Sequence, residues 1–203
     1  MTRRLGLFLL VLPAVVASGC GGRSTADLDD ALTVGLPGFV TAAERPLPET
    51  LCDPSPSGGE PPGLPPEFGD LGAPAAAFYE RAESTVEAYA WAADDAAGVV
   101  DAATRAAADC THEIFFDSDT DGDGQLDAGG TDVQEVASWE GSGWTGVRIH
   151  RKVGGTGSAE QVERRLVRTD DVVLLMVLRS DLLGEEQSAP LDSLLEQVHD
   201  SLQ

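Results

Sequence analysis

Basic side chains are scarce in this 203-residue sequence. It contains 13 Lys and Arg residues against 35 Asp and Glu residues, which gives a formal net charge of −22 at pH 7. This excess opposes binding to nucleic acids and adsorption to anionic lipid, because both carry negative charge themselves. It suits high solubility and binding of cations or of a basic partner. We therefore expect no nucleic-acid partner.

A long hydrophobic run is also lacking. The most apolar stretch, Leu5–Val16, is shorter than the roughly 20 residues that a membrane-spanning helix needs. It follows two arginines and precedes three small residues and Cys20, which is the order of a bacterial signal peptide with a lipoprotein cleavage site. We expect residues 1–19 to be removed and Cys20 to be lipidated, with diacylglycerol and palmitate as membrane anchor. An N-terminal membrane helix and an unlipidated secreted protein are the alternatives.

Cysteine is rare, with three residues in the chain. If Cys20 carries lipid, Cys52 and Cys110 remain as an even pair in an oxidising compartment, which favours a disulfide bond between them. That bond would close a loop of about 58 residues and stabilise the fold by about 4 kcal/mol in the chain-entropy model. Two separate buried thiols are the alternative.

Motifs of common catalytic sites are missing too. The three histidines, His112, His150 and His199, have no metal-ligand spacing to one another or to a cysteine. The stretch Gly141–Gly143 lacks the G-x-S-x-G pattern of a serine nucleophile, and Gly154–Ser158 lacks the lysine of a phosphate-binding loop. We therefore predict that the protein is not an enzyme.

Composition divides the exported part of the chain into three regions. Residues 20–30 are small and polar, which is typical of a tether. Residues 31–74 are rich in proline and predict an extended segment on the surface of the domain, attached through Cys52. Residues 75–203 have the periodic patterns of a folded domain.

Periodicity in this last region predicts an α+β fold. Alternating or continuous apolar residues indicate strands at 85–91, 113–116, 133–139, 144–153, 161–168 and 172–178. Apolar residues at helical spacing indicate helices at 96–108 and 191–202. Consecutive strands joined by short turns pair antiparallel. We therefore expect a mainly antiparallel sheet of five to six strands with both helices packed on one face.

The order of these features resembles a known family. Residues 31–38 read ALTVGLPG, a cysteine follows, the Ala-rich helix ends at a second cysteine, and residues 166–173 read LVRTDDVV before the terminal helix. This order is similar to that of actinobacterial lipoproteins related to the extracellular sensor domain of the receptor kinase PknH. The resemblance covers residues 31–203. It implies a ligand-sensing or envelope-binding role and indicates no particular ligand.

An acidic loop, DSDTDGDGQLD at residues 117–127, carries the clearest chemical motif. From its second aspartate it matches the first nine positions of an EF-hand-type calcium loop, whose oxygen ligands favour Ca²⁺. The ligands would be Asp119, Asp121, Asp123, Gln125 through its main-chain carbonyl, and Asp127. Gly130 stands where a bidentate glutamate is usual, so we expect weak, structural binding, with a Kd of about 10⁻⁴ to 10⁻³ M. A solvated acidic hairpin tip is the alternative.

These features together favour a non-catalytic ligand-binding or sensor domain on the extracytoplasmic face of the cell membrane, with a small ligand or an envelope protein as partner. One alternative is a carrier of lipid or another apolar envelope molecule. Another is a Ca²⁺-dependent adhesion or scaffold module. A large aliphatic cavity would favour the carrier, a filled core with a polar cleft the sensor, and a filled core without a cleft the scaffold.

Overall fold

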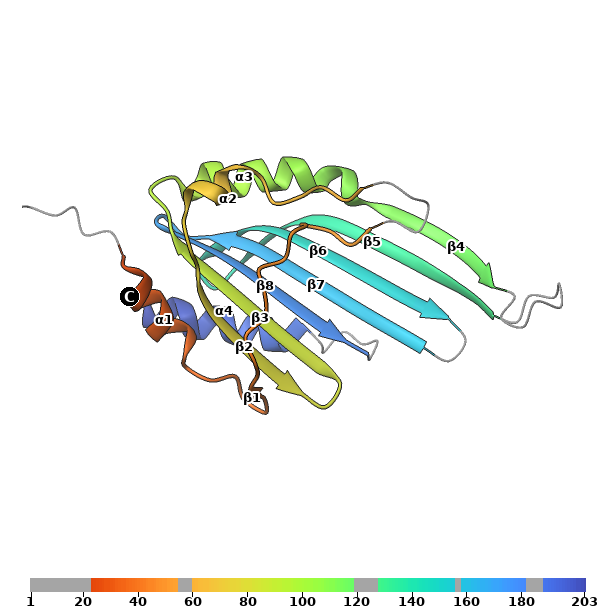
Figure 1. The fold of residues 1–203 in the computed structure, drawn as a ribbon, viewed down its shortest axis with the longest axis horizontal. Helices are drawn as coiled ribbons and strands as arrows, with labels where there is room; N and C mark the ends of the chain where they lie inside the picture. Colours follow the sequence, from red (N-terminus) through yellow and green to blue (C-terminus); the bar gives the residue numbers. More distant parts are fainter. Residues whose placement is uncertain (1–22, 55–59, 119–127, 156–157, 182–187) are drawn as a thin grey trace, which may run out of the picture.

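The computed structural model describes residues 23–54, 60–118, 128–155, 158–181 and 188–203 (Figure 1). Its strands are β1 (Val40–Thr41), β2 (Ala75–Arg81), β3 (Ser84–Ala92), β4 (His112–Ser118), β5 (Ala128–Gly141), β6 (Trp144–Gly155), β7 (Ser158–Arg168) and β8 (Val172–Ser180). Its helices are α1 (Thr25–Leu32), α2 (Glu67–Asp70), α3 (Ala96–Ala107) and α4 (Ala189–Ser201), with a 3₁₀ turn, η1 (Ala108–Cys110), after α3.

The eight strands formed by the described residues belong to one antiparallel sheet in the order β1-β2-β3-β8-β7-β6-β5-β4. Strands β4 to β8 form a meander in which each strand pairs with the next. The β2–β3 hairpin joins this meander by pairing β3 with β8. The α+β class and the antiparallel sheet are thus confirmed, and each of the six predicted strands lies within one of β3 to β8.

Strand β8 lies inside the sheet, and its apolar side chains on both faces require a packed layer on each face of the sheet. Its residues Val172–Leu178 are all buried, as a continuous apolar run requires. Leu174 and Met176 belong to a core with α1 and α4, whereas Val173 and Leu175 belong to a second core with α3.

The prediction that both helices lie on one face is therefore wrong. Helices α3 and α4 pack on opposite sides of the sheet (Figure 1). An apolar stripe indicates that one side of a helix is buried, but it does not indicate on which face of the sheet the helix packs. The apolar run of β8 was the available signal, because a strand that is apolar on both faces needs a layer on each.

Most of helix α1 lies within residues 20–30, the stretch that we expected to be a polar tether. Ser24 caps it, since the Ser24 side chain accepts from the Asp27 amide while the Asp27 carboxylate accepts from the Ser24 amide. The helix buries Leu28, Ala31 and Leu32 against the α4 side of the sheet. Three buried apolar residues in eight form too short a pattern to stand out, and β1, α2 and the Ala-rich β2 were missed for the same reason.

Between β1 and α2, the Pro-rich segment follows the α3 side of the sheet. Its described part between β1 and α2 holds one isolated bridge, Thr50 to Gly63, and packs Leu47, Leu51 and Leu64 against the second core. The predicted disulfide bond between Cys52 and Cys110 is present. It joins this segment to η1, the turn that follows α3.

Candidate functional site

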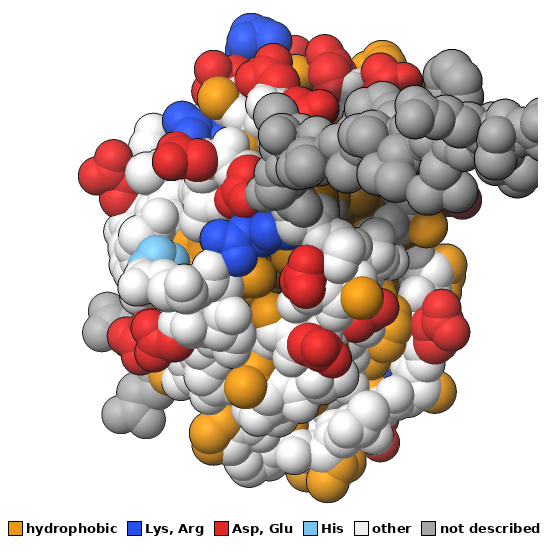
Figure 2. Space-filling view, turned by 90° about the vertical axis from the view of Figure 1, so that its left-hand side faces the viewer, with side chains coloured by type: hydrophobic (Ala, Val, Ile, Leu, Met, Phe, Trp, Pro, Cys, Tyr) orange, Lys and Arg blue, Asp and Glu red, His pale blue; other side chains and the backbone are white. Residues whose placement is uncertain are grey.

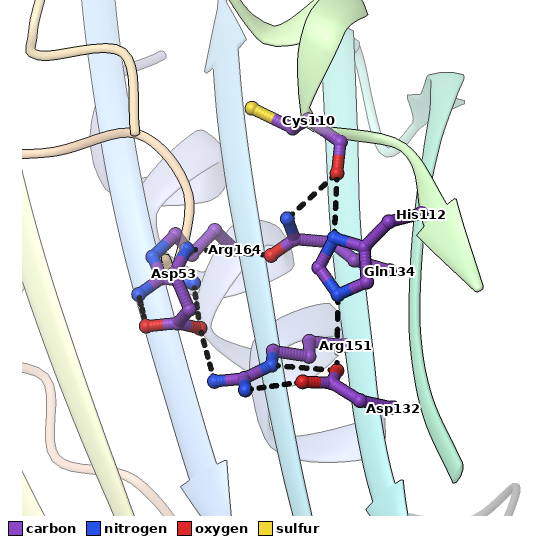
Figure 3. Close-up of polar contacts among 7 residues, drawn as sticks. All are labelled: Asp53, Cys110, His112, Asp132, Gln134, Arg151 and Arg164. Atoms are coloured by element: carbon purple, nitrogen blue, oxygen red, sulfur yellow. Dashed lines mark hydrogen bonds and ion pairs between the residues drawn. The ribbon is translucent and has the colours of Figure 1, made fainter. Parts of the chain in front are cut away.

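Six polar side chains gather on the α3 side of the sheet, next to the disulfide bond (Figure 3). They come from the Pro-rich segment and from four neighbouring strands, β4 to β7. We call them the Asp53 network: Asp53, His112, Asp132, Gln134, Arg151 and Arg164. The strand pattern explains the placement, because Arg151 is two residues beyond buried Ile149 and Arg164 is two residues before buried Leu166.

Two bidentate ion pairs form the centre of the network. Arg164 donates from both terminal nitrogens to the two carboxylate oxygens of Asp53, each at 2.7 Å. Arg151 donates to Asp132 from Nε at 2.9 Å and from Nη2 at 2.6 Å. The pairs meet where Arg151 Nη1 lies 3.9 Å from Asp53 Oδ2. This geometry matches the planar guanidinium to the carboxylate and makes the hydrogen bonds strong.

The arginines keep both carboxylates ionised. Burial opposes ionisation of Asp53, but the hydrogen bonds and positive charge of Arg164 hold its pKa below the ordinary value. Burial likewise opposes ionisation of Asp132, and hydrogen bonds from Arg151 and His112 lower its pKa nevertheless. The pKa of Arg151 is raised, chiefly by its hydrogen bond to Asp132.

His112 and Gln134 connect the ion pairs to the main chain beside the disulfide bond. His112 Nε2 lies 3.1 Å from Asp132 Oδ1, and its Nδ1 lies 3.2 Å from the Cys110 carbonyl oxygen. Because both partners accept hydrogen bonds, both contacts form together only when the imidazole carries two protons. Gln134 donates to the Cys110 carbonyl at 2.8 Å and accepts from the Asp53 amide at 3.3 Å.

Chemically, the network is suited to holding the Pro-rich segment in place. Each carboxylate is bound at two points by a guanidinium, which lowers its pKa and makes it a weak general base at neutral pH. These charges therefore attach the Pro-rich segment, which has little secondary structure of its own, to the sheet.

A separate open cleft of about 610 Å³ lies at the end of the molecule where α3 begins. We call it the end cleft. It is formed by Arg23 ahead of α1, by α2, by the β3–α3 connection, by α3 itself and by the β7–β8 turn. Its charged lining residues are Arg23, Glu67, Asp70, Asp94, Asp95, Arg105 and Asp171. Figure 2 looks at this end of the molecule, where acidic side chains surround a small group of basic ones.

Several of these charges already have partners. Arg23 Nε lies 2.9 Å from Asp171 Oδ2, and its Nη1 donates to the Leu202 carbonyl. Asp95 caps α3 by accepting from the Gly98 amide at 2.9 Å. Glu67, Asp70 and Asp94 are exposed. The cleft therefore presents net negative charge over a partly apolar surface that includes Leu71, Ala93 and Val99.

The sequence-predicted sites fall largely outside the described residues. The signal peptide with Cys20 does so, as do the calcium ligands Asp119, Asp121, Asp123, Gln125 and Asp127. Among the residues that the structure describes, no group of three or more His, Cys, Asp or Glu could hold a metal ion, and no helix is long and apolar enough to cross a bilayer. Lipidation and calcium binding remain predictions.

Sequence reasoning missed the Asp53 network, and of His112 it found only that the residue lacks metal-ligand spacing. A signal was present in the strands, because Arg151 and Arg164 occupy positions that the alternating pattern turns inward. Nothing in the Pro-rich segment distinguished Asp53 from its other acidic residues.

Comparison with known proteins adds no family. A scan against protein-family models found no match, and a search of curated proteins found none either. The similarity to PknH-type sensor domains therefore rests on the sequence pattern alone.

Proposed function

We propose that this protein is a non-catalytic ligand-binding domain, anchored by a lipid on Cys20 to the extracytoplasmic face of the membrane, and that its ligand binds in the end cleft. The observation that carries this proposal is the cleft itself. Its volume of about 610 Å³ lies within the range of roughly 300–1,000 Å³ that is typical of small-molecule sites. Its walls come from distant parts of the chain and rest on both cores.

The charge of the cleft favours a small cationic ligand. Five acidic side chains line it against two arginines, and Arg23 is already paired with Asp171. The exposed carboxylates of Glu67, Asp70 and Asp94 are free to attract ammonium groups at close range. A polyamine combines several such groups with an apolar chain and fits this mixed lining.

A polar cleft supports the sensor hypothesis over the lipid carrier. Two further clefts, of about 490 and 440 Å³, are likewise open and carry charged side chains, including Arg81, Glu83 and Arg179 in one and Asp101 and Arg168 in the other. A carrier would need a cavity lined by aliphatic side chains.

Calorimetric titration of spermidine into the full chain tests the cleft. We expect saturable binding that Glu67→Gln/Asp70→Asn weakens about fivefold or more, because two attractive charges disappear. Glu196→Gln/Asp200→Asn is the matched control, since it removes the same charge from exposed positions on α4. Equal binding by the wild type and both variants would refute the cleft as the binding site.

The anchor and the calcium loop need separate tests. Cys20→Ala should move the protein from the membrane fraction to the soluble fraction or leave it unprocessed; unchanged mass and fractionation would refute lipidation. Calcium added to the full chain should give saturable heat that Asp121→Ala/Asp123→Ala abolishes. If several millimolar Ca²⁺ gives no heat, the loop is an acidic hairpin tip and the calcium-dependent scaffold is ruled out.

A further inference from the structure

The two edges of the sheet differ in how open they are. At one edge the short strand β1, with two residues, pairs with β2. At the other edge β4 offers seven residues, HEIFFDS, and none of the described strands pairs with its outer side. It contains neither proline nor lysine, the residues that commonly block an edge. Alternate residues of β4 therefore present main-chain donors and acceptors to an incoming strand.

Exposed side chains on β4 give this edge a chemical character. Phe115 is 75% exposed, more than any other large apolar residue that the structure describes. Phe116, on the other face, lies over Gly130, where an added Cβ would approach its Cζ to 2.6 Å. Glu113 and Asp117 lie two residues to either side of Phe115, on its face of the sheet, and both are exposed. On one face of this edge, an exposed aromatic side chain therefore lies between two exposed carboxylates.

We propose that the β4 edge binds an extended segment of a partner protein as a ninth strand, with an apolar residue beside Phe115 and basic residues beside Glu113 and Asp117. Strand addition of this kind obtains affinity from main-chain hydrogen bonds and specificity from alternate side chains. Opposite charges on neighbouring strands stabilise their pairing, so the two acids select a basic partner.

Charge also argues against a second copy as the occupant. Antiparallel self-pairing centred on Phe115 would place Glu113 of one chain opposite Asp117 of the other, and like charges in that position are destabilising. The net charge of −22 adds repulsion between whole chains. A basic segment of another protein avoids both effects.

The test uses two blocked heptapeptides, Thr-Lys-Val-Phe-Val-Lys-Thr and Thr-Glu-Val-Phe-Val-Glu-Thr, each with a fluorescent label, titrated with the full chain by anisotropy. We expect the lysine peptide to bind about tenfold or more tightly than the glutamate peptide. Glu113→Lys/Asp117→Lys should reverse that preference. Glu196→Lys/Asp200→Lys changes the net charge equally at exposed positions of α4 and should keep the wild-type order.

Two further measurements separate strand addition from general attraction. Phe115→Ala should weaken the lysine peptide about fivefold, and bound peptide should slow amide hydrogen exchange in β4. Equal binding of both peptides by the wild type, or equal effects of the two charge-reversed variants, would overturn the proposal. So would a dimer, seen by sedimentation, that Phe115→Ala dissociates. The cleft variant Glu67→Gln/Asp70→Asn should bind the lysine peptide like the wild type, so failure of one proposal leaves the other intact.

Discussion

Two consecutive arginines on β7 hold different layers to opposite faces of the same sheet. Arg164 faces the α3 side and binds Asp53 of the Pro-rich segment at 2.7 Å through two nitrogens. Arg165 faces the α4 side, where it donates to Glu163 at 2.7 Å and to Asp192 of α4 at 2.5 Å. Its guanidinium also lies 4.8 Å from the ring centre of Trp139. Both arginine side chains are nearly inaccessible to solvent.

The difference lies in what each arginine attaches. Helix α4 satisfies its own backbone and buries an apolar stripe that includes Leu191, Leu194, Leu195 and Val198. The Pro-rich segment has little secondary structure between β1 and α2. A helix with its own apolar face needs an ion pair less than a proline-rich segment does. We therefore expect the α3 side to depend on its covalent and ionic attachments, and the α4 side to depend on apolar packing.

Removing the disulfide bond should have the largest effect. Cys52→Ser/Cys110→Ser abolishes the cross-link over a sequence separation of 58 residues, and the free energy of unfolding should fall by about 4 kcal/mol. Urea denaturation of the full chain measures this. Cys20→Ser is the matched control and should leave the urea midpoint unchanged. A loss below about 1 kcal/mol in the double variant would show that the segment stays attached without the bond.

Breaking the ion pair on the α3 side should cause the second-largest loss in the free energy of unfolding. Asp53→Asn leaves the buried charge of Arg164 without its carboxylate, so the free energy of unfolding should fall by about 3 kcal/mol or more. Urea denaturation again gives the value. Limited proteolysis should at the same time cut the Pro-rich segment faster, because its attachment to the sheet is lost. Unchanged proteolysis would mean that packing of Leu47, Leu51 and Leu64 is enough to hold the segment.

Much of the sheet could be predicted from the sequence, because alternation and the apolar run of β8 are strong, local signals. The apolar run of β8 also indicated that both faces are covered. It could not tell which helix covers which face, since that depends on which side of the sheet each connection crosses. The Asp53 network was partly visible, as arginines at inward positions of β6 and β7 call for buried partners. The identity of the partner was hidden, because Asp53 precedes Arg164 by 111 residues and lies in a segment without periodicity.

Acid should weaken the Asp53 network. The pKa values of Asp53 and Asp132 are lower in the folded protein than the value of about 3.9 in an unfolded chain. Their stabilising contribution is therefore fully present above about pH 4 to 5 and is lost as the pH falls through the folded-state pKa values. Urea midpoints measured between pH 6 and pH 2 should drop steeply at the acid end. Asp53→Asn/Asp132→Asn should start lower and drop less, and parallel curves for the two proteins would assign the acid sensitivity to other carboxylates.

The matching substitution on the α4 side should have the smallest effect. Asp192 is 54% exposed, so Asp192→Asn removes a charge that water already screens, and Arg165 keeps its buried bond to Glu163. We expect the free energy of unfolding to fall by less than about 1 kcal/mol, measured under the same conditions as Asp53→Asn. The two variants make the same chemical change, and they differ only in the face of the sheet on which the changed residue acts. Losses of equal size would show that α4 also depends on its ion pair, and that its apolar stripe does not suffice to hold it on the sheet.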